Sequence, residues 1–266
     1  MINLEGPYLL FLGDVQDQLA AKTANGIAYW RPNECVGQLR LSGCLADVGI
    51  PDRTLREARI DGAKTLVLGV ANRGGVISKN WINTIFNAVE MGYNVASGLH
   101  GLLNAIPELE KRAGIANVDL FNVRYSEIGN PVANGKKRTG KRLLTVGSDC
   151  SVGKMFTALA IERSLKNQGF NATFRASGQT GIFIARTGVC IDAVISDFVA
   201  GAAELLSPDN DSDHWDIIEG QGSLFHPSYA GVSLGLLHGS QPDSLILCHD
   251  IDRANMRGLK EFDVPK

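Results

Sequence analysis

LLTVGSDCSVGKM, residues 143–155, is the stretch of sequence that decides the fold. Its apolar first half predicts a strand, and the Gly153-Lys154 pair predicts the first turn of a helix after a short loop. Strand, loop and helix in this order form a phosphate-binding loop, in which backbone N–H groups and a lysine ammonium surround the anion. We expect this loop to bind a phosphate-bearing cofactor through Ser148, Asp149, Cys150, Ser151, Val152, Gly153, Lys154 and Met155.

The loop departs from the usual phosphate-binding motif in two ways. Five residues instead of four separate Gly147 from Gly153, and Met155 stands where the motif has a serine or threonine. That hydroxyl normally ligates Mg²⁺, and a thioether is a poor ligand for so hard a cation. The loop is therefore better suited to holding a diphosphate than to Mg-dependent transfer of a terminal phosphoryl group.

The rest of the chain alternates short apolar runs with helical stretches, which is typical of an α/β protein with parallel strands. Strands are expected at Tyr8–Gly13, Thr65–Ala71, Asn94–Ser97, Asp119–Tyr125, Leu143–Gly147, Ala172–Ala176, Ala193–Ser196, Asp216–Glu219 and Ser244–Cys248. Helices are expected at Thr54–Asp61, Ser78–Met91, Leu102–Ala113, Gly153–Asn167 and Gly201–Leu206. We predict an N-terminal Rossmann-like unit followed by a P-loop NTPase-like domain with a doubly wound parallel sheet.

Residues 126–142 interrupt this alternation with glycine, asparagine and cations and with few large apolar side chains. The segment is typical of a linker, which places the domains at residues 1–127 and 128–266. Its cations are expected either to be solvated or to meet phosphates bound at the following loop: Lys136, Lys137, Arg138, Lys141 and Arg142.

Composition argues against several classes of protein. The 266 residues carry 26 Lys+Arg and 28 Asp+Glu, a net charge of −2, and no apolar run near the roughly 18 residues of a membrane span. Nucleic acid and membranes are thus not expected as partners, and a cytoplasmic location is expected. The five cysteines contain no C-x-x-C pair and the histidines no H-x-x-x-H pair, so no metal is expected.

The segment WDIIEGQG, residues 215–222, is an apolar strand that ends in Glu219 and a glycine-rich turn. With the G-S-D-C-S-V-G-K loop it resembles the corresponding parts of dethiobiotin synthetase. In a doubly wound sheet, ligands bind at the carboxyl ends of the strands, so Glu219 is expected beside the loop.

A second resemblance covers nearly the whole chain. Besides the loop, the segments that carry it are Phe11–Asp14, Gly69–Gly75, Ser97–His100, Ser177–Gly181, Ser196–Gly201, Glu219–Gly222 and Leu236–Gly239. Together they resemble a family long described as a domain of unknown function, some of whose members are D-glutamate N-acetyltransferases of the DgcN type. The family continues past the equivalent of Lys266, so the chain is expected to be truncated at its C-terminus.

The resemblance implies transfer of acetyl from acetyl-CoA, as cosubstrate, to the α-amine of an acidic amino acid, D-glutamate above all. This reaction needs a base, and the candidate catalytic residues are Glu219, Asp197 and His226. An acyl-enzyme on Cys150 is a second route. Candidate substrate-binding residues follow strands, with Arg73 as a carboxylate clamp: Asn72, Arg73, Gly74, Gly75, His100, Gln179 and Thr180. The site is expected between the domains, and a homodimer is expected.

Two other functions stay open at this stage. An ATP-dependent ligase or kinase in the style of dethiobiotin synthetase would need Asp149 or Glu219 to replace the missing metal-binding hydroxyl. A nucleotide-binding regulator would bind its ligand without turnover. Replacing Met155 with serine separates the readings, because only the ligase reading expects a gain in Mg-ATP activity.

Overall fold

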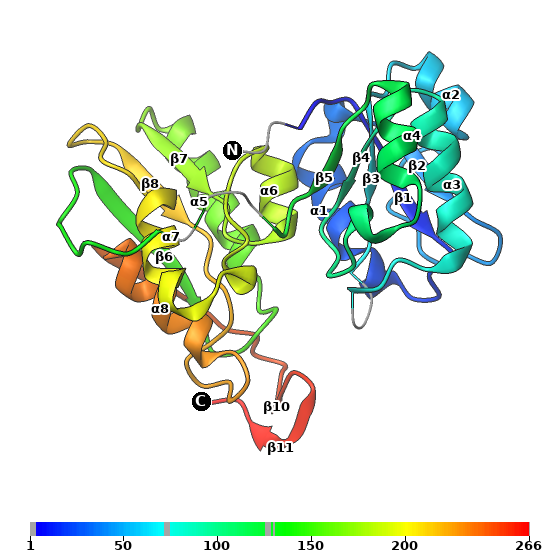
Figure 1. The fold of residues 1–266 in the computed structure, drawn as a ribbon. Helices are drawn as coiled ribbons and strands as arrows, with labels where there is room; N and C mark the ends of the chain where they lie inside the picture. The colour runs from blue at the N-terminus through cyan, green and yellow to red at the C-terminus, as the bar shows by residue number, and fades with distance from the viewer. Residues whose placement is uncertain (1–3, 72–74, 126–128, 130, 266) are drawn as a thin grey trace. The chain divides into compact units, whose positions relative to one another are not determined.

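A computed structural model describes residues 4–71, 75–125, 129 and 131–265. The chain divides into two compact units, Ile2–Arg124 and Tyr125–Lys266 (Figure 1). Each unit has its own parallel sheet and its own helices. No helix in the described part of the chain is long and apolar enough to cross a membrane.

The N-terminal unit is built on a five-stranded parallel sheet in the order β2-β1-β3-β4-β5. The strands are β1 Tyr8–Gly13, β2 Cys35–Arg40, β3 Thr65–Leu68, β4 Asn94–Ser97 and β5 Leu120–Asn122. β1 and β3 are buried along their whole length, which explains their unbroken apolar sequences. The strand order reverses beside β1, as in Rossmann-like folds.

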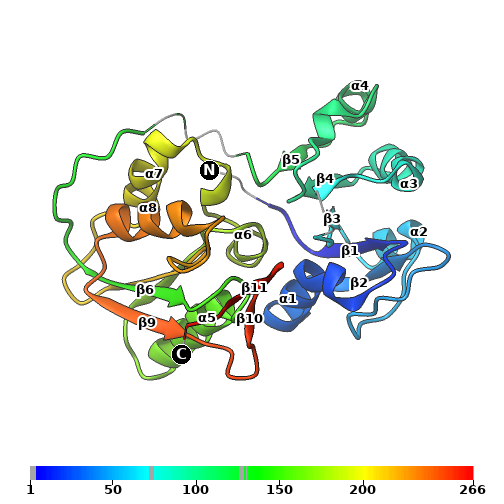
Figure 2. The same ribbon diagram turned by 90° about the horizontal axis from the view of Figure 1, so that it is seen from below.

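Four α-helices connect these strands: α1 Lys22–Trp30, α2 Leu55–Ile60, α3 Lys79–Glu90 and α4 Leu109–Ala116. Short 3₁₀ turns lie at Gln18–Ala21, Pro32–Glu34 and Leu103–Ala105. Thr54 and Glu57 form a capping box that starts α2, and the Ser78 hydroxyl caps α3. Right-handed crossovers place α1 on one face of the sheet and α3 and α4 on the other (Figure 2).

The C-terminal unit has a four-stranded parallel sheet in the order β7-β8-β6-β9. Its strands are β6 Lys141–Gly147, β7 Ala172–Arg175, β8 Trp215–Ile218 and β9 Ser244–Cys248, and its helices are α5 Lys154–Asn167, α6 Gln179–Ala185, α7 Val199–Leu206 and α8 Ala230–Ser240. Short 3₁₀ turns lie at Ile191–Ala193 and Ser196–Phe198, and a hairpin of β10 Asn255–Met256 and β11 Leu259–Asp263 follows the sheet. Because β6 is central, the loop after it lies in the middle of the sheet's carboxyl edge.

Two predicted elements are wrong, and the elements that were missed are β2, β10, β11, α1, α6 and α8. Residues 193–196, predicted as a strand, connect two 3₁₀ turns, so Asp197 does not end a strand. The helix predicted at Leu102–Ala113 is broken, because Pro107 is disfavoured within a helix and Glu108 takes a left-handed conformation before α4 begins. β2 was missed because glycine and glutamine interrupt its apolar sequence.

Two cations of the predicted linker have a structural role. Arg142 is buried and its guanidinium donates to the carbonyl oxygens of Arg138 and Thr139. The guanidinium of Arg138 in turn donates to the carbonyls of Gly239 and Ser240. Arg142 lies near the start of β6, whereas the phosphate loop follows its end. Neither arginine is solvated as a free linker residue, and neither is placed to meet a phosphate at the loop.

Candidate active site

The phosphate-binding loop joins the end of β6 to the start of α5, as the sequence predicts. Gly153 precedes the helix with φ +94°, a conformation that L side chains rarely adopt, and Ser151 has φ +54°. Among the described residues, no hydrogen-bond acceptor is recorded for the backbone N–H groups of Ser151, Val152 and Gly153. Three such N–H groups at the N-terminus of a helix are suited to binding an anion.

Lys154 supplies the cation of this loop. Its side chain is 7% exposed, and its ammonium donates to the carbonyl oxygen of Asp149 at 2.9 Å. Burial lowers the pKa of Lys154, and the neighbouring carboxylates of Asp149 and Glu219 oppose that effect. An anion bound at the loop would relieve the cost of burying this cation.

Asp149 holds the loop in shape rather than facing a ligand. Its fully buried carboxylate accepts the N–H of Cys150 at 2.6 Å, the N–H of Arg257 at 2.8 Å and the guanidinium of Arg253 at 3.0 Å. Burial alone would raise the pKa of Asp149, but these hydrogen bonds outweigh it and lower the pKa. The carboxylate is therefore ionised and already fully engaged within the protein.

Glu219 follows β8, whose neighbour in the sheet is β6. Its carboxylate is buried and accepts the N–H of Ser177 at 2.9 Å and the N–H of Gly178 at 3.1 Å. Burial raises the pKa of Glu219 to about 7, although those hydrogen bonds lower it in part. A carboxyl group that titrates near neutral pH is suited to proton transfer.

The start of α6 packs directly against this carboxylate. A Cβ placed on Gly181 would lie 2.3 Å from Oε2 of Glu219, so no larger residue fits there without a shift. Gln179 and Thr180, both predicted to bind substrate, are the first residues of α6 and lie next to Gly178 in the chain. The side-chain amide of Gln221 donates to the Ser177 hydroxyl at 3.2 Å. The structure thus groups Glu219 with the α6 residues that the sequence singled out.

His226 lies beside the loop but both of its ring nitrogens have partners. Nδ1 accepts the N–H of Ser228 at 3.2 Å, which leaves Nε2 as the protonated nitrogen, 3.1 Å from the carbonyl oxygen of Arg257. Ligand atoms of Asp149, Cys150 and His226 lie within 4.8 Å of one another. Because the carboxylate and the imidazole are already hydrogen bonded within the protein, this cluster does not suit a metal ion. Asp197, the third candidate base, is exposed on its 3₁₀ turn.

The candidates in the N-terminal unit are described in part. Asn72, Arg73 and Gly74 lie outside the described residues. Gly75 and His100 follow β3 and β4 and touch each other, since a Cβ on Gly75 would lie 2.6 Å from Cδ2 of His100. The carboxyl ends of neighbouring parallel strands thus bring these two candidates together.

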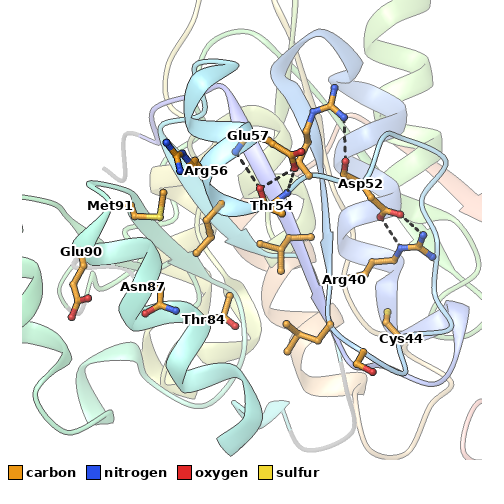
Figure 3. Close-up of a pocket in the computed structure, with 15 residues that line it drawn as sticks. Arg40, Cys44, Asp52, Thr54, Arg56, Glu57, Thr84, Asn87, Glu90 and Met91 are labelled. Atoms are coloured by element: carbon orange, nitrogen blue, oxygen red, sulfur yellow. Dashed lines mark hydrogen bonds and ion pairs between the residues drawn. The ribbon is translucent and has the colours of Figure 1, made fainter.

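A cavity of about 970 Å³ opens in the same unit, lined from the end of β2, the start of α2 and one side of α3 (Figure 3). None of the residues predicted at the site lines it. Several of its charged groups already have partners within the protein: Arg40 pairs with Asp52, Arg53 with Asp61 and Glu90 with Arg112, and Glu57 is hydrogen bonded to Thr54. We therefore assign it no ligand.

Sequence reasoning missed Arg253 and Arg257, which contact the loop from about a hundred residues further along the chain. No local pattern marks either of them. Ser177 and Gly178, whose N–H groups donate to Glu219, lie in the segment Ser177–Gly181. In the sequence this segment is marked only by its resemblance to the family. Its position after β7, a neighbour of β8, could have identified them.

Fold and loop together define a two-domain α/β protein with a Rossmann-like unit and a P-loop unit. The chain belongs to the DUF1611 family: residues 39–126 match its N-terminal Rossmann-like domain and residues 131–266 its C-terminal P-loop domain, both described as domains of unknown function. The chain is also similar to a crystal structure of a DUF1611 family protein from Anabaena variabilis ATCC 29413. The TM-score is 0.84 at 28% identity, covering 97% of this chain and 79% of the other. The predicted fold class is confirmed.

Two curated relatives carry a functional name. A D-glutamate N-acetyltransferase from Tritonibacter scottomollicae is 57% identical over 262 residues, which covers 98% of this chain and 79% of the relative. A D-glutamate N-acetyltransferase from Pseudoalteromonas sp. is 51% identical over 264 residues, 99% of this chain and 80% of the relative. The resemblance stated from the sequence motifs is confirmed.

Proposed function

We propose that this protein is an N-acetyltransferase that moves the acetyl group of acetyl-CoA to the α-amine of D-glutamate. The observation that carries the proposal is the identity of 51–57% to two D-glutamate N-acetyltransferases across both units of the chain. The loop geometry supports it, because coenzyme A contains a diphosphate that unpaired N–H groups and Lys154 could hold. Met155 provides no hydroxyl for Mg²⁺, and the carboxylates of Asp149 and Glu219 are already hydrogen bonded within the protein. Both features fit a reaction that cleaves no phosphoanhydride.

Glu219 is the base that we propose. In the reaction the amine nitrogen forms a bond to the thioester carbonyl carbon, the C–S bond breaks, and coenzyme A leaves as its thiolate. The amine must first lose a proton, which the ionised Glu219 carboxylate can accept because its pKa is about 7. Asp197 and His226 are kept as weaker proposals: Asp197 is exposed, and both ring nitrogens of His226 have partners.

Substrate binding is proposed for the remaining candidates, Asn72, Arg73, Gly74, Gly75, His100, Gln179 and Thr180. Gln179 and Thr180 are supported by their place next to Gly178, which donates to Glu219. Gly75 and His100 are supported by their mutual contact after β3 and β4. Alanine at Thr180 or at His100 is expected to raise KM for D-glutamate more than KM for acetyl-CoA.

The competing ligase reading finds no support in the loop. It requires Asp149 or Glu219 to ligate Mg²⁺ in place of the hydroxyl that Met155 lacks. Asp149 already accepts three hydrogen bonds from the protein, and Glu219 accepts two from backbone N–H groups. In the substitution Met155→Ser, Mg-ATP hydrolysis is expected to remain at background; a strong gain in phosphate release would restore the ligase reading.

The proposal also covers the location of the enzyme, its need for a metal and its oligomeric state. We propose a cytoplasmic enzyme of D-amino-acid catabolism, supported by five free cysteines and by the use of acetyl-CoA. No metal is required by this chemistry. A homodimer is proposed because large apolar side chains are exposed, among them Leu245 and Leu247 on β9. Light scattering on the purified protein would then give twice the mass of one chain.

Thiol release from acetyl-CoA tests the function. The assay is run with D-glutamate, with L-glutamate and without an amine, and in parallel with Mg-ATP. We expect release that depends on D-glutamate and exceeds the amine-free control. Release that is equal in all three arms, or turnover of Mg-ATP alone, would contradict the proposal. Tight nucleotide binding without any turnover would favour the regulator instead.

A further inference from the structure

The segment after β9 is tied to the phosphate-binding loop by Arg253. Its guanidinium donates to the Asp149 carboxylate at 3.0 Å, to the Cys150 carbonyl at 2.6 Å and to the Ser151 carbonyl at 3.2 Å. It also pairs with Asp250 at 3.3 Å. In a trans peptide the C=O of one residue and the N–H of the next point in opposite directions. Arg253 therefore turns the N–H groups of Ser151 and Val152 away from itself, which leaves them available to an anion.

Arg257 is anchored at the same place by its backbone alone. Its N–H donates to Asp149 at 2.8 Å, and its carbonyl oxygen lies 3.1 Å from Nε2 of the buried His226. Both backbone groups of Arg257 are thus fixed against residues that line the loop. The position of its Cα is set by the loop and does not depend on the side chain.

The guanidinium of Arg257 has no partner in the part of the chain that the structure describes. No hydrogen bond and no ion pair is recorded for it, in contrast to Arg253. The residue is half-buried, so its charge is only partly solvated. It lies close enough to act on the Cys150 thiol: burial raises the pKa of that thiol, and Arg257 is among the cations that oppose the rise. An unpaired, partly desolvated cation whose backbone is fixed at a loop with three unpaired N–H groups is suited to contact a phosphate.

We propose that the guanidinium of Arg257 is a direct ligand of a phosphate group bound at the loop, and that Arg253 positions the loop without touching the ligand. The loop would then hold its anion from both sides, with Lys154 from α5 and Arg257 from the turn between β10 and β11. The identity of the ligand as coenzyme A rests on the proposed function; the phosphate contact itself does not.

Measurements of ligand binding and of stability distinguish the roles proposed for Arg253 and Arg257. Calorimetric titration with inorganic pyrophosphate and with coenzyme A is performed on wild type, Arg257→Ala, Arg257→Lys and Arg253→Ala. Lys260→Ala is the matched control, because it removes an exposed cation from the same hairpin. The melting temperature of each protein without ligand is measured alongside.

For Arg257→Ala we expect affinity for both ligands to fall by about tenfold or more, with an unchanged melting temperature, since a charge-assisted contact is lost only in the complex. Arg257→Lys should recover part of the affinity, because it restores the charge without the planar fork. Arg253→Ala should lower both the melting temperature and the affinity. Lys260→Ala should change neither. A titration with dephospho-coenzyme A, which lacks the 3′-phosphate, shows which phosphate Arg257 contacts. If Arg257→Ala weakens the binding of this ligand less than that of coenzyme A, the contact is to the 3′-phosphate.

The inference would be overturned if Arg257→Ala bound both ligands as tightly as wild type. It would also be overturned if wild type bound neither pyrophosphate nor coenzyme A. If wild type binds pyrophosphate but not coenzyme A, and Arg257→Ala weakens that binding, the phosphate contact stands and the proposed function fails. The titration therefore distinguishes the two failures.

Discussion

Ser177 donates two hydrogen bonds to Glu219, one to its side chain and one to its backbone. The Ser177 N–H donates to the Glu219 carboxylate at 2.9 Å, and the Ser177 hydroxyl donates to the Glu219 carbonyl oxygen at 2.5 Å. The two residues lie after the neighbouring strands β7 and β8. This pairing fixes a buried carboxylate with a pKa of about 7 beside the phosphate-binding loop, and the proposed mechanism depends on it.

The substitution Glu219→Gln should abolish most of the turnover while keeping the fold. Glutamine can still accept the N–H of Ser177, but it cannot take a proton, and loss of a general base costs about a hundredfold or more in kcat. Steady-state rates should show a large fall in kcat with little change in KM for acetyl-CoA. In wild type, kcat/KM should rise with pH through about 7, and the variant should lack this limb. A change in KM for acetyl-CoA alone would mean that Glu219 serves the phosphate site and not the chemistry.

Stability should also depend on pH through Glu219. Its pKa is about 7 in the folded protein, whereas 4.5 is the ordinary value of a glutamate, so the folded state binds more protons between these limits. The free energy of unfolding should therefore fall as pH rises from about 4.5 to 7, by up to about 3 kcal/mol from this group. Denaturant unfolding at several pH values, compared with Glu219→Gln, isolates the effect. Parallel curves for the two proteins would contradict it.

The substitution Gly181→Ala should displace the carboxylate of Glu219, the proposed base. The new methyl group would lie 2.3 Å from Oε2 of Glu219, and such overpacking costs about 1–3 kcal/mol. We expect a lower melting temperature and a lower kcat. Gly231→Ala in α8 is the matched control, since nothing lies within 4 Å of its added methyl and helix propensity should stabilise it by about 0.5–1 kcal/mol. If Gly181→Ala and Gly231→Ala have the same effect on the melting temperature and on kcat, the close approach of Gly181 to Glu219 is not important.

The substitution Lys154→Met should impair acetyl-CoA binding. Methionine has a similar volume but no charge, and a charge-assisted contact to phosphate is worth about 1.5–3 kcal/mol. KM for acetyl-CoA should rise by about tenfold or more, while the melting temperature does not fall because a buried cation is removed. Lys166→Met, on the exposed end of the same helix, is the control that should leave KM unchanged. An unaltered KM in Lys154→Met would argue against phosphate binding at this loop.

The phosphate-binding loop and Glu219 could both be predicted from the sequence, because a local sequence pattern marks each of them. The apolar run of β6, the glycine before α5 and Lys154 are consecutive, so the loop could be placed without a structure. Glu219 could be placed because parallel strands bring their carboxyl ends to one edge. The strand predicted at residues 193–196 is wrong because so short an apolar run also occurs between 3₁₀ turns, and here Ile195 and Ser196 are exposed.

Long-range contacts could not be predicted. Arg253 and Arg257 reach Asp149 across more than a hundred residues, and nothing in their neighbourhood marks them. The pKa of Glu219 was equally hidden, because it depends on burial by α6 and on two backbone donors. Helix α1 went unnoticed since it contains asparagine and glycine at its centre, which favour turns.

The most direct test of the account is the identity of the product. The protein is incubated with acetyl-CoA labelled with ¹³C in the acetyl group and with an equimolar mixture of D- and L-glutamate, and the products are separated on a chiral column before mass analysis. We predict labelled N-acetyl-D-glutamate in an amount equal to the coenzyme A released. Label in the L-enantiomer alone, or coenzyme A released without any N-acetylated glutamate, would contradict the account.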